Sequence, residues 1–181
     1  FERVALKAES ARDYFLLVGP PGTGKTSRAL RRMVEHFYAA SSMQILLLAY
    51  TNRAVDEICQ SLSSITPCID YIRVGSELSC DVRFRGHLLE NILAECNSRR
   101  EVNIRMADCR VYVGTVASIA AKAELFKLKR FDVAIVDEAT QILEPQLLGI
   151  LCAKFADERN AVGKFILIGD HKQLPAVILQ N

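Results

Sequence analysis

The amino-acid sequence predicts an α/β domain with a parallel central sheet and helices on both faces. First, the runs at residues 45–50, 133–136 and 165–168 are apolar at almost every position, which is typical of parallel strands buried on both faces. Second, stretches with apolar residues at helical spacing separate these runs, and strands that alternate with helices form βαβ units. Third, a length of 181 residues favours one domain.

The elements of the first third of the chain follow in order. Residues 15–18 predict a strand that stops at Gly19, and the helix after it has apolar residues at helical spacing at Leu30, Met33, Val34 and Phe37. Residues 45–50 form the next expected strand. Asn52 could cap the following helix, whose buried stripe would be Val55, Ile58, Cys59 and Leu62.

The alternation continues to the end of the chain. Residues 69–74 are a weaker strand candidate. Before the strand expected at 111–113, a helix is indicated by Leu88, Leu89, Ile92, Leu93 and Cys96. After the strand at 133–136, Pro145 could help to start a helix that contains Leu147, Leu148 and Leu151. Residues 165–168 are the last expected strand.

Residues 1–181 are expected to form this single domain, without an internal repeat or a Pro/Gly/Ser-rich linker. The least patterned stretch, 75–110, holds six Lys/Arg and six Asp/Glu residues, so it is no basic patch. We expect it to be a surface excursion from the core of the domain.

Composition excludes several classes of protein. With 50% hydrophobic and 24% charged residues, the chain is neither disordered nor collagen-like. The net charge of +2 excludes a strongly basic arm and leaves nucleic acid open as a partner. No apolar run approaches the roughly 20 residues of a membrane span. The six cysteines have no CxxC pair, so we expect no structural zinc and an intracellular, cytoplasmic protein, or a nuclear one in a eukaryote.

A phosphate-binding loop follows the first expected strand. The pattern GxxxxGK[ST] is matched by Gly19, Pro20, Pro21, Gly22, Thr23, Gly24, Lys25 and Thr26. The glycines allow successive N–H groups to face one anion, and the helix that begins near Lys25 adds its positive end. Lys25 is expected to reach the β- and γ-phosphates of ATP, and the Thr26 hydroxyl to ligate Mg²⁺. The alternative is a chance match in a glycine-containing turn.

Two carboxylates end the strand at residues 133–136. Ligands of parallel sheets bind beyond the carboxyl ends of the strands, so Asp137 is expected to hold Mg²⁺ through its water shell. Glu138 is expected to orient and deprotonate the water that attacks the γ-phosphate. The alternative for both is an ordinary helix N-terminus, where acidic residues favour the dipole.

Three further segments, with these two, resemble the first motor domain of superfamily 1 helicases, closest to the Upf1/Dna2-like branch. Residues 19–26 match motif I. The others, in family order, are Ala49–Asp56 (AYTNRAVD, motif Ia), 113–118 (VGTVAS, motif Ib), 137–141 (DEATQ, motif II) and 169–175 (GDHKQLP, motif III). The resemblance implies a RecA-like P-loop NTPase fold for the domain.

The resemblance also implies roles for single residues. Gln173 would sense the γ-phosphate and take part in catalysis, and Gln141 would join motifs II and III near the nucleotide. Thr51, Asn52 and Thr115 would contact the sugar-phosphate backbone of a single strand. Structural alternatives remain: Thr51 and Asn52 could only cap a helix, Thr115 could end a strand, and Gln173 could be a surface side chain.

The expected function is the ATP-binding and hydrolysing half of a helicase that moves along single-stranded DNA or RNA. Family members carry a second motor domain that supplies arginine fingers, worth roughly 10³–10⁵ in turnover. This sequence lacks it, so we expect a fragment that is nearly inactive alone. The main alternative is a P-loop ATPase that acts as a switch or loader on proteins and tracks no strand.

Overall fold

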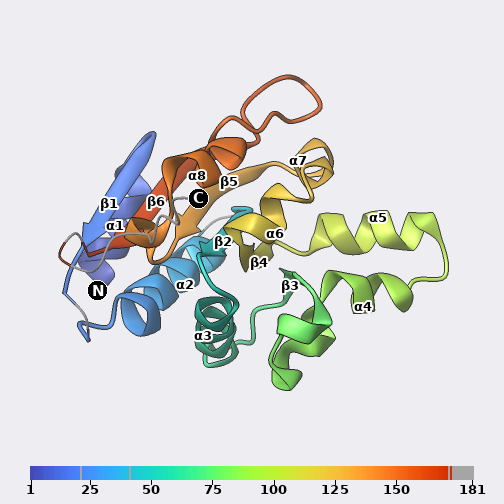
Figure 1. Ribbon diagram of the computed structural model, residues 1–181, viewed down its shortest axis with the longest axis horizontal. Coiled ribbons are helices and arrows are strands. Elements are labelled where there is room, and N and C mark those ends of the chain that lie inside the picture. Colours follow the sequence, from blue (N-terminus) through green and yellow to red (C-terminus); the bar gives the residue numbers. More distant parts are fainter. Residues whose placement is uncertain (21, 41, 171, 173–181) are drawn as a thin grey trace, which may run out of the picture.

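The computed structural model describes residues 1–20, 22–40, 42–170 and 172. Its core is a six-stranded sheet in the order β1-β6-β5-β2-β4-β3, and every adjacent pair is parallel (Figure 1). The strands are β1 (Tyr14–Val18), β2 (Ile45–Ala49), β3 (Tyr71–Val74), β4 (Val111–Thr115), β5 (Phe131–Val136) and β6 (Val162–Gly169). The expected α/β fold with a parallel sheet, consistent with the RecA-like P-loop fold, is confirmed.

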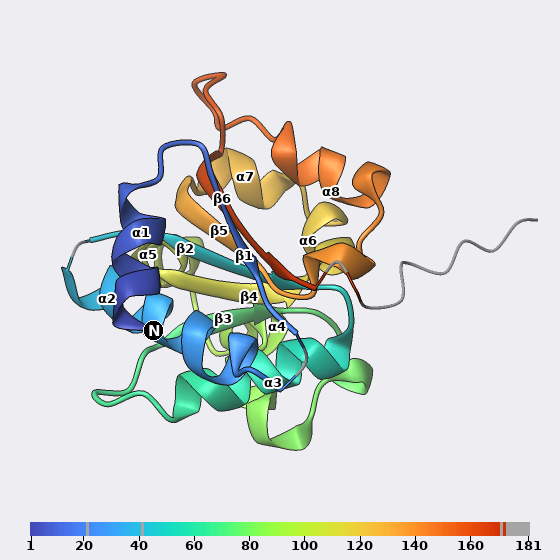
Figure 2. The same cartoon turned by 90° about the vertical axis from the view of Figure 1, so that its left-hand side faces the viewer.

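Helices cover both faces of the sheet (Figure 2). One face packs against α1 (Glu2–Ser10), α2 (Arg31–Ala40) and α3 (Asn52–Ser63). The other packs against α4 (Leu89–Ala94), α6 (Val116–Ala120), α7 (Glu124–Leu128) and α8 (Glu144–Leu151). The apolar side of each helix is buried where it packs against the sheet. This burial of apolar surface holds the layers together.

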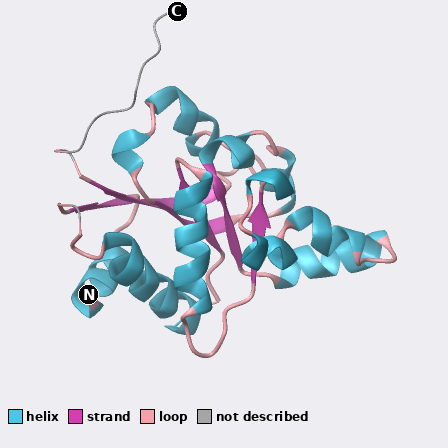
Figure 3. Cartoon of the chain, turned by 60° about the horizontal axis from the view of Figure 1, so that its bottom comes forward, coloured by secondary structure: helices cyan, strands magenta, loops and turns pink. Residues whose placement is uncertain are grey.

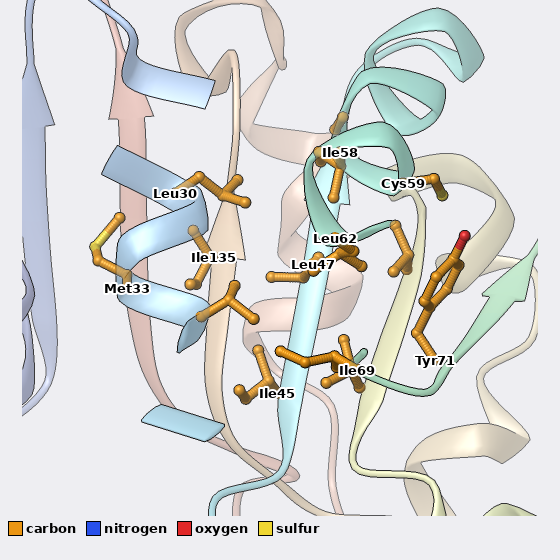
Figure 4. Packing of buried hydrophobic residues seen from close by; sticks show 14 of the residues in the cluster. Leu30, Met33, Ile45, Leu47, Ile58, Cys59, Leu62, Ile69, Tyr71 and Ile135 are labelled. Carbon is orange, nitrogen blue, oxygen red and sulfur yellow. The ribbon is translucent and has the colours of Figure 1, made fainter. Parts of the chain in front are cut away.

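The alternation of side chains along β2 shows why both faces are needed. Ile45 and Leu47 point into the cluster beneath α2 and α3, where Leu47 lies beside Leu62 (Figure 4). Leu46 and Leu48 point into the cluster on the opposite face. All four leucine and isoleucine side chains of Ile45–Leu48 are 0% exposed, which explains the unbroken apolar run in the sequence.

The structure corrects one predicted helix start. Thr51, and not Asn52, is the N-cap of α3, because the Thr51 hydroxyl accepts a hydrogen bond from the Ala54 N–H at 3.1 Å. Asn52 is the first residue inside the helix. The β-region backbone of Thr51 (φ −112°, ψ 155°) is the conformation that an N-cap residue adopts.

Two buried lysines hold helices that the sequence pattern did not predict. Lys164 of β6 donates to the carbonyls of Ala8 at 2.9 Å and Glu9 at 2.8 Å, at the end of α1. Lys129 donates in the same way to the carbonyls of Met106 at 3.0 Å and Cys109 at 2.7 Å, at the end of α5 (Arg99–Asp108). A cation at a helix C-terminus satisfies carbonyls that have no partner within the helix.

The segment after β3 is helical and extends outward. It contains two 3₁₀ turns, η2 (Glu77–Ser79) and η3 (Val82–His87), and then α4 and α5. Helix α4 buries Leu89 and Ile92, whereas α5 buries none of its residues. The α4–α5 pair projects beyond the sheet (Figures 1 and 3).

Within the described residues, one face of the edge strand is exposed. On the outer face of the edge strand β1, Tyr14, Leu16 and Val18 are 67%, 55% and 57% exposed.

No helix in the described part of the chain is long and apolar enough to span a bilayer.

Candidate nucleotide-binding site

The glycine-rich loop leaves the carboxyl end of β1 and turns into a helical segment, η1 (Lys25–Leu30). Gly22 and Gly24 have φ values of 75° and 80°, in the left-handed region that side chains disfavour. The Gly24 carbonyl accepts from the N–H groups of Arg28 and Ala29, both at 2.9 Å. The predicted strand–loop–helix context is therefore present, with the positive helix end directed at the loop.

Lys25 folds back onto its own loop. Its ammonium group donates to the carbonyl of Gly19 and, at 2.8 Å, to that of Pro20. The side chain thus lies over the loop, where an anion bound by the loop N–H groups would meet it. Thr23 closes the same turn, because its hydroxyl donates to the Pro20 carbonyl at 2.8 Å.

Thr26 and Asp137 come together although they lie 111 positions apart in the sequence. The Thr26 hydroxyl donates to the Asp137 carboxylate. Asp137 follows β5 directly, is 2% exposed, and its backbone N–H bonds to Leu48 of β2 at 2.8 Å. Burial raises the pKa of this carboxyl above its ordinary value, although the Thr26 hydroxyl opposes the shift.

A desolvated carboxylate beside a hydroxyl is a donor set that fits Mg²⁺, because both are hard oxygen ligands. The buried negative charge of Asp137 is stabilised by a cation more than by water, which hardly reaches it. Thr26 and Asp137 are therefore the residues that would hold the metal.

Glu138 has a left-handed backbone with φ 51° and ψ 36°, which is uncommon for a residue other than glycine. Its N–H donates to Asp137 Oδ1 at 3.0 Å, which fixes the turn. The residue is half-buried, and burial, followed by the charges of Asp137 and Glu57, raises the pKa of its carboxyl. The turn directs both carboxylates of the acidic pair into one cavity.

That cavity has a volume of about 290 Å³ and is lined by Gly22, Gly24, Lys25, Thr26, Ser27, Glu57, Asp137, Glu138 and Gly169. Sequence reasoning assigned no role to Ser27, Glu57 and Gly169, although Gly169 begins the segment that resembles motif III. Glu57 is the sixth residue of α3, the helix that follows the carboxyl end of β2, so the rule that ligands meet at this edge of a parallel sheet could have pointed to it. Gly169 is required there, because a Cβ atom would lie 2.9 Å from Thr140.

The remaining predicted nucleotide residues are less tightly grouped. Gln141 is half-buried in η4 (Ala139–Gln141), directly after the acidic pair, and does not line this cavity as described. Pro21 and Gln173 lie outside the described residues.

The predicted nucleic-acid residues lie at the same edge of the sheet. The ends of β2 and β4 are neighbours, with Ala49 opposite Thr115. Thr51 and Asn52 are exposed, whereas Thr115 is only 7% exposed. The Thr115 hydroxyl accepts from the Ser118 N–H at 3.0 Å and donates to the Ser118 hydroxyl at 2.8 Å. Thr115 therefore caps α6, and its hydroxyl is already engaged.

Comparison with known proteins points in one direction. A family described as an AAA domain matches residues 2–108 and 97–181. The DNA replication ATP-dependent helicase/nuclease JHS1 of Arabidopsis thaliana is 34% identical over 173 residues, which cover 96% of this chain and 12% of the relative. DNA replication ATP-dependent helicase/nuclease DNA2 is 33% identical in Homo sapiens and 32% in Gallus gallus, over 94% and 93% of this chain.

The chain spans only 12% to 16% of the length of these three relatives. The family match over residues 2–181 includes the glycine-rich loop and the acidic pair. The chain belongs to the AAA domain family, as a motor domain of the superfamily 1 helicases of the Upf1/Dna2-like branch.

Proposed function

We propose that this chain is the ATP-binding and hydrolysing half of a helicase that couples hydrolysis to movement along single-stranded DNA. The observation that carries the proposal is the hydrogen bond between Thr26 and Asp137. It joins the phosphate loop to the acidic strand end in one cavity, which is the arrangement that phosphoryl transfer needs. The names of the relatives, each a DNA replication ATP-dependent helicase/nuclease, support ATP and DNA as the ligands.

Each residue of the cavity has a proposed task. The N–H groups around Gly22 and Gly24 would cradle the phosphates, and Lys25 would leave its loop carbonyls to pair with the β- and γ-phosphates. Thr26 and Asp137 would hold Mg²⁺. The bound metal neutralises charge on the phosphoryl oxygens.

Glu138 is the proposed general base. Its raised proton affinity, caused first by burial, suits a carboxylate that takes a proton from water. Gln173 as the γ-phosphate sensor and Gln141 as the link between motifs II and III belong to the same proposal, as does a second motor domain that supplies an arginine finger.

The strand contacts are proposed for the edge that holds Thr51, Asn52 and Thr115. Thr51 and Asn52 lie at the positive end of α3 and are exposed, so this segment can approach a phosphate. Because the Thr115 hydroxyl is occupied, we assign it the task of shaping the edge. An intracellular location remains part of the proposal.

The test is ATP hydrolysis by the full-length protein that contains this chain, with and without oligo(dT) or oligo(U), beside its Glu138→Gln variant. We expect single-stranded DNA to stimulate turnover, and the variant to bind nucleotide but lose about 10²–10⁴ in rate. Stimulation by oligo(U) alone would mean that the protein moves along RNA and not along DNA. Hydrolysis that neither polymer changes would favour a switch that acts on proteins.

A further inference from the structure

Two cavities meet at the beginning of α3. The first is the cavity at the phosphate loop described above, and the second is a groove of about 430 Å³ lined by polar and charged residues. Thr26, Ser27 and Glu57 line both. The groove is also lined by Arg53, which follows Thr51 and Asn52 in the sequence. Glu57 therefore lies on the wall between the nucleotide pocket and the segment proposed to contact the strand.

Arg53 and Glu57 form an ion pair across one turn of α3, with Arg53 Nε 3.6 Å from Glu57 Oε1. Their side chains are 91% and 60% exposed. A cation in the first turn opposes the helix dipole, and an Arg that precedes its Glu partner is the weaker order of such a pair. Helix stability thus gives no reason for an arginine at this position.

Phosphate binding explains an arginine at position 53 better than helix stability does. The guanidinium of Arg53 is almost fully exposed at the positive end of a helix, and a guanidinium binds phosphate oxygens through paired donors. A strand phosphate at Thr51 and Asn52 would compete with Glu57 for Arg53.

The other partner, Glu57, acts on the nucleotide pocket. Its charge contributes to the raised pKa values of both Asp137 and Glu138. In the described lining of the cavity, three carboxylates face the single ammonium group of Lys25. A Glu57 carboxylate released from Arg53 therefore increases the attraction of this cavity for a hydrated divalent cation.

We propose that the Arg53–Glu57 pair couples the two sites. A strand phosphate draws Arg53 away, and the released Glu57 then tightens the binding of Mg²⁺–nucleotide. Glu57 is thus a positioning residue that acts through the metal, and the inference rests on the proposed function. Coupling is reciprocal, so nucleotide should tighten strand binding by the same factor. For an exposed ion pair, that factor is about 1.5 to 5.

The experiment measures binding, without turnover. A fluorescent, non-hydrolysable ATP analogue is titrated into the full-length protein in Mg²⁺, with and without saturating oligo(dT). The variants are Arg53→Gln, Glu57→Gln and both together. The matched control carries Arg159→Gln and Asp157→Asn, because that exposed pair has the same 3.6 Å separation and does not line either cavity.

In the wild type and the control, oligo(dT) should tighten nucleotide binding. Arg53→Gln should tighten it about 1.5- to 5-fold before any strand is added, because Glu57 is already released. In both single variants, oligo(dT) should tighten nucleotide binding by a factor about 1.5 to 5 times smaller than in the wild type. In the double variant, this factor should be no smaller than in either single variant. A strand effect of wild-type size in both single variants, or losses that add in the double variant, would overturn the coupling alone. Failure of the wild type to bind oligo(dT) would overturn the proposed function, and the coupling with it.

Discussion

Replacement of Lys164 by Met should detach one helix while the rest of the fold remains. Lys164 is 7% exposed as a residue. Met preserves its apolar stem and removes the ammonium group, which donates to the Ala8 and Glu9 carbonyls at 2.9 and 2.8 Å. Hydrogen bonds to a charged group contribute about 1.5–3 kcal/mol each. Burial also lowers the Lys164 pKa, so part of that gain is offset by desolvation of the cation. The net loss should be about 2–3 kcal/mol, confined to the attachment of α1.

The assay is amide hydrogen exchange followed by mass spectrometry on the full-length protein. A loss of 2–3 kcal/mol in local opening corresponds to exchange about 30- to 150-fold faster in α1. Lys129→Met is the reciprocal control, because Lys129 holds the end of α5 in the same way. Lys164→Met should accelerate amide exchange in α1 only, and Lys129→Met in α5 only. Equal exchange of α1 in the wild type and in Lys164→Met would refute the reasoning, and so would acceleration spread over the sheet.

Three further predictions concern the metal site, two thiols and the sheet edge. Asp137→Asn should raise the Mg²⁺ concentration needed for half-maximal nucleotide binding about tenfold, as calorimetry would show; an unchanged requirement would contradict the assigned ligand. Burial raises the pKa of Cys59 and of Cys109 from 9.0 to about 11, so their contribution to stability is complete below pH 9 and is lost as the pH rises towards 11. The urea midpoint should therefore fall less over this range in a Cys59→Ala, Cys109→Ala variant, and parallel curves would count against it. Leu16→Lys, on the bare face of β1, should reduce self-association of residues 1–181 in light scattering, whereas Leu128→Lys, at a position 65% exposed on α7, should not.

The strands could be predicted because each carries its signal within a few consecutive residues. The run at 45–50 is apolar throughout since β2 is covered on both sides. Helices α1 and α5 could not be predicted in this way. The buried residues of α1 are only Ala5 and Ala8, and α5 has none. The end of each helix is held by a lysine from elsewhere in the chain, Lys164 of β6 for α1 and Lys129, just before β5, for α5, and no local pattern predicts such a contact.

The residues of the candidate site also differ in whether a local sequence pattern predicts them. The glycine-rich loop and the pair Asp137–Glu138 are contiguous motifs, so both their chemistry and their place at the strand ends could be read from the sequence. The rule that ligands bind beyond the carboxyl ends of parallel strands points to the start of α3, but which of its side chains lines the cavity depends on how α3 packs beside the loop. The cap of α3 is a smaller case: Thr51 and Asn52 are both good capping residues, and only the backbone conformation distinguishes them.

The position of Lys25 on its own loop has a consequence for inhibitor design. Because two of its three N–H donors already bond the Gly19 and Pro20 carbonyls, the ammonium group can give a ligand only one hydrogen bond before a loop bond has to break. A ligand that takes up more than that one donor has to displace a loop carbonyl, and charged phosphate oxygens, which accept stronger hydrogen bonds than a neutral carbonyl, are suited to do so. A small neutral compound that fills the glycine cradle and leaves Lys25 on its loop carbonyls would compete with ATP without having to imitate a phosphate.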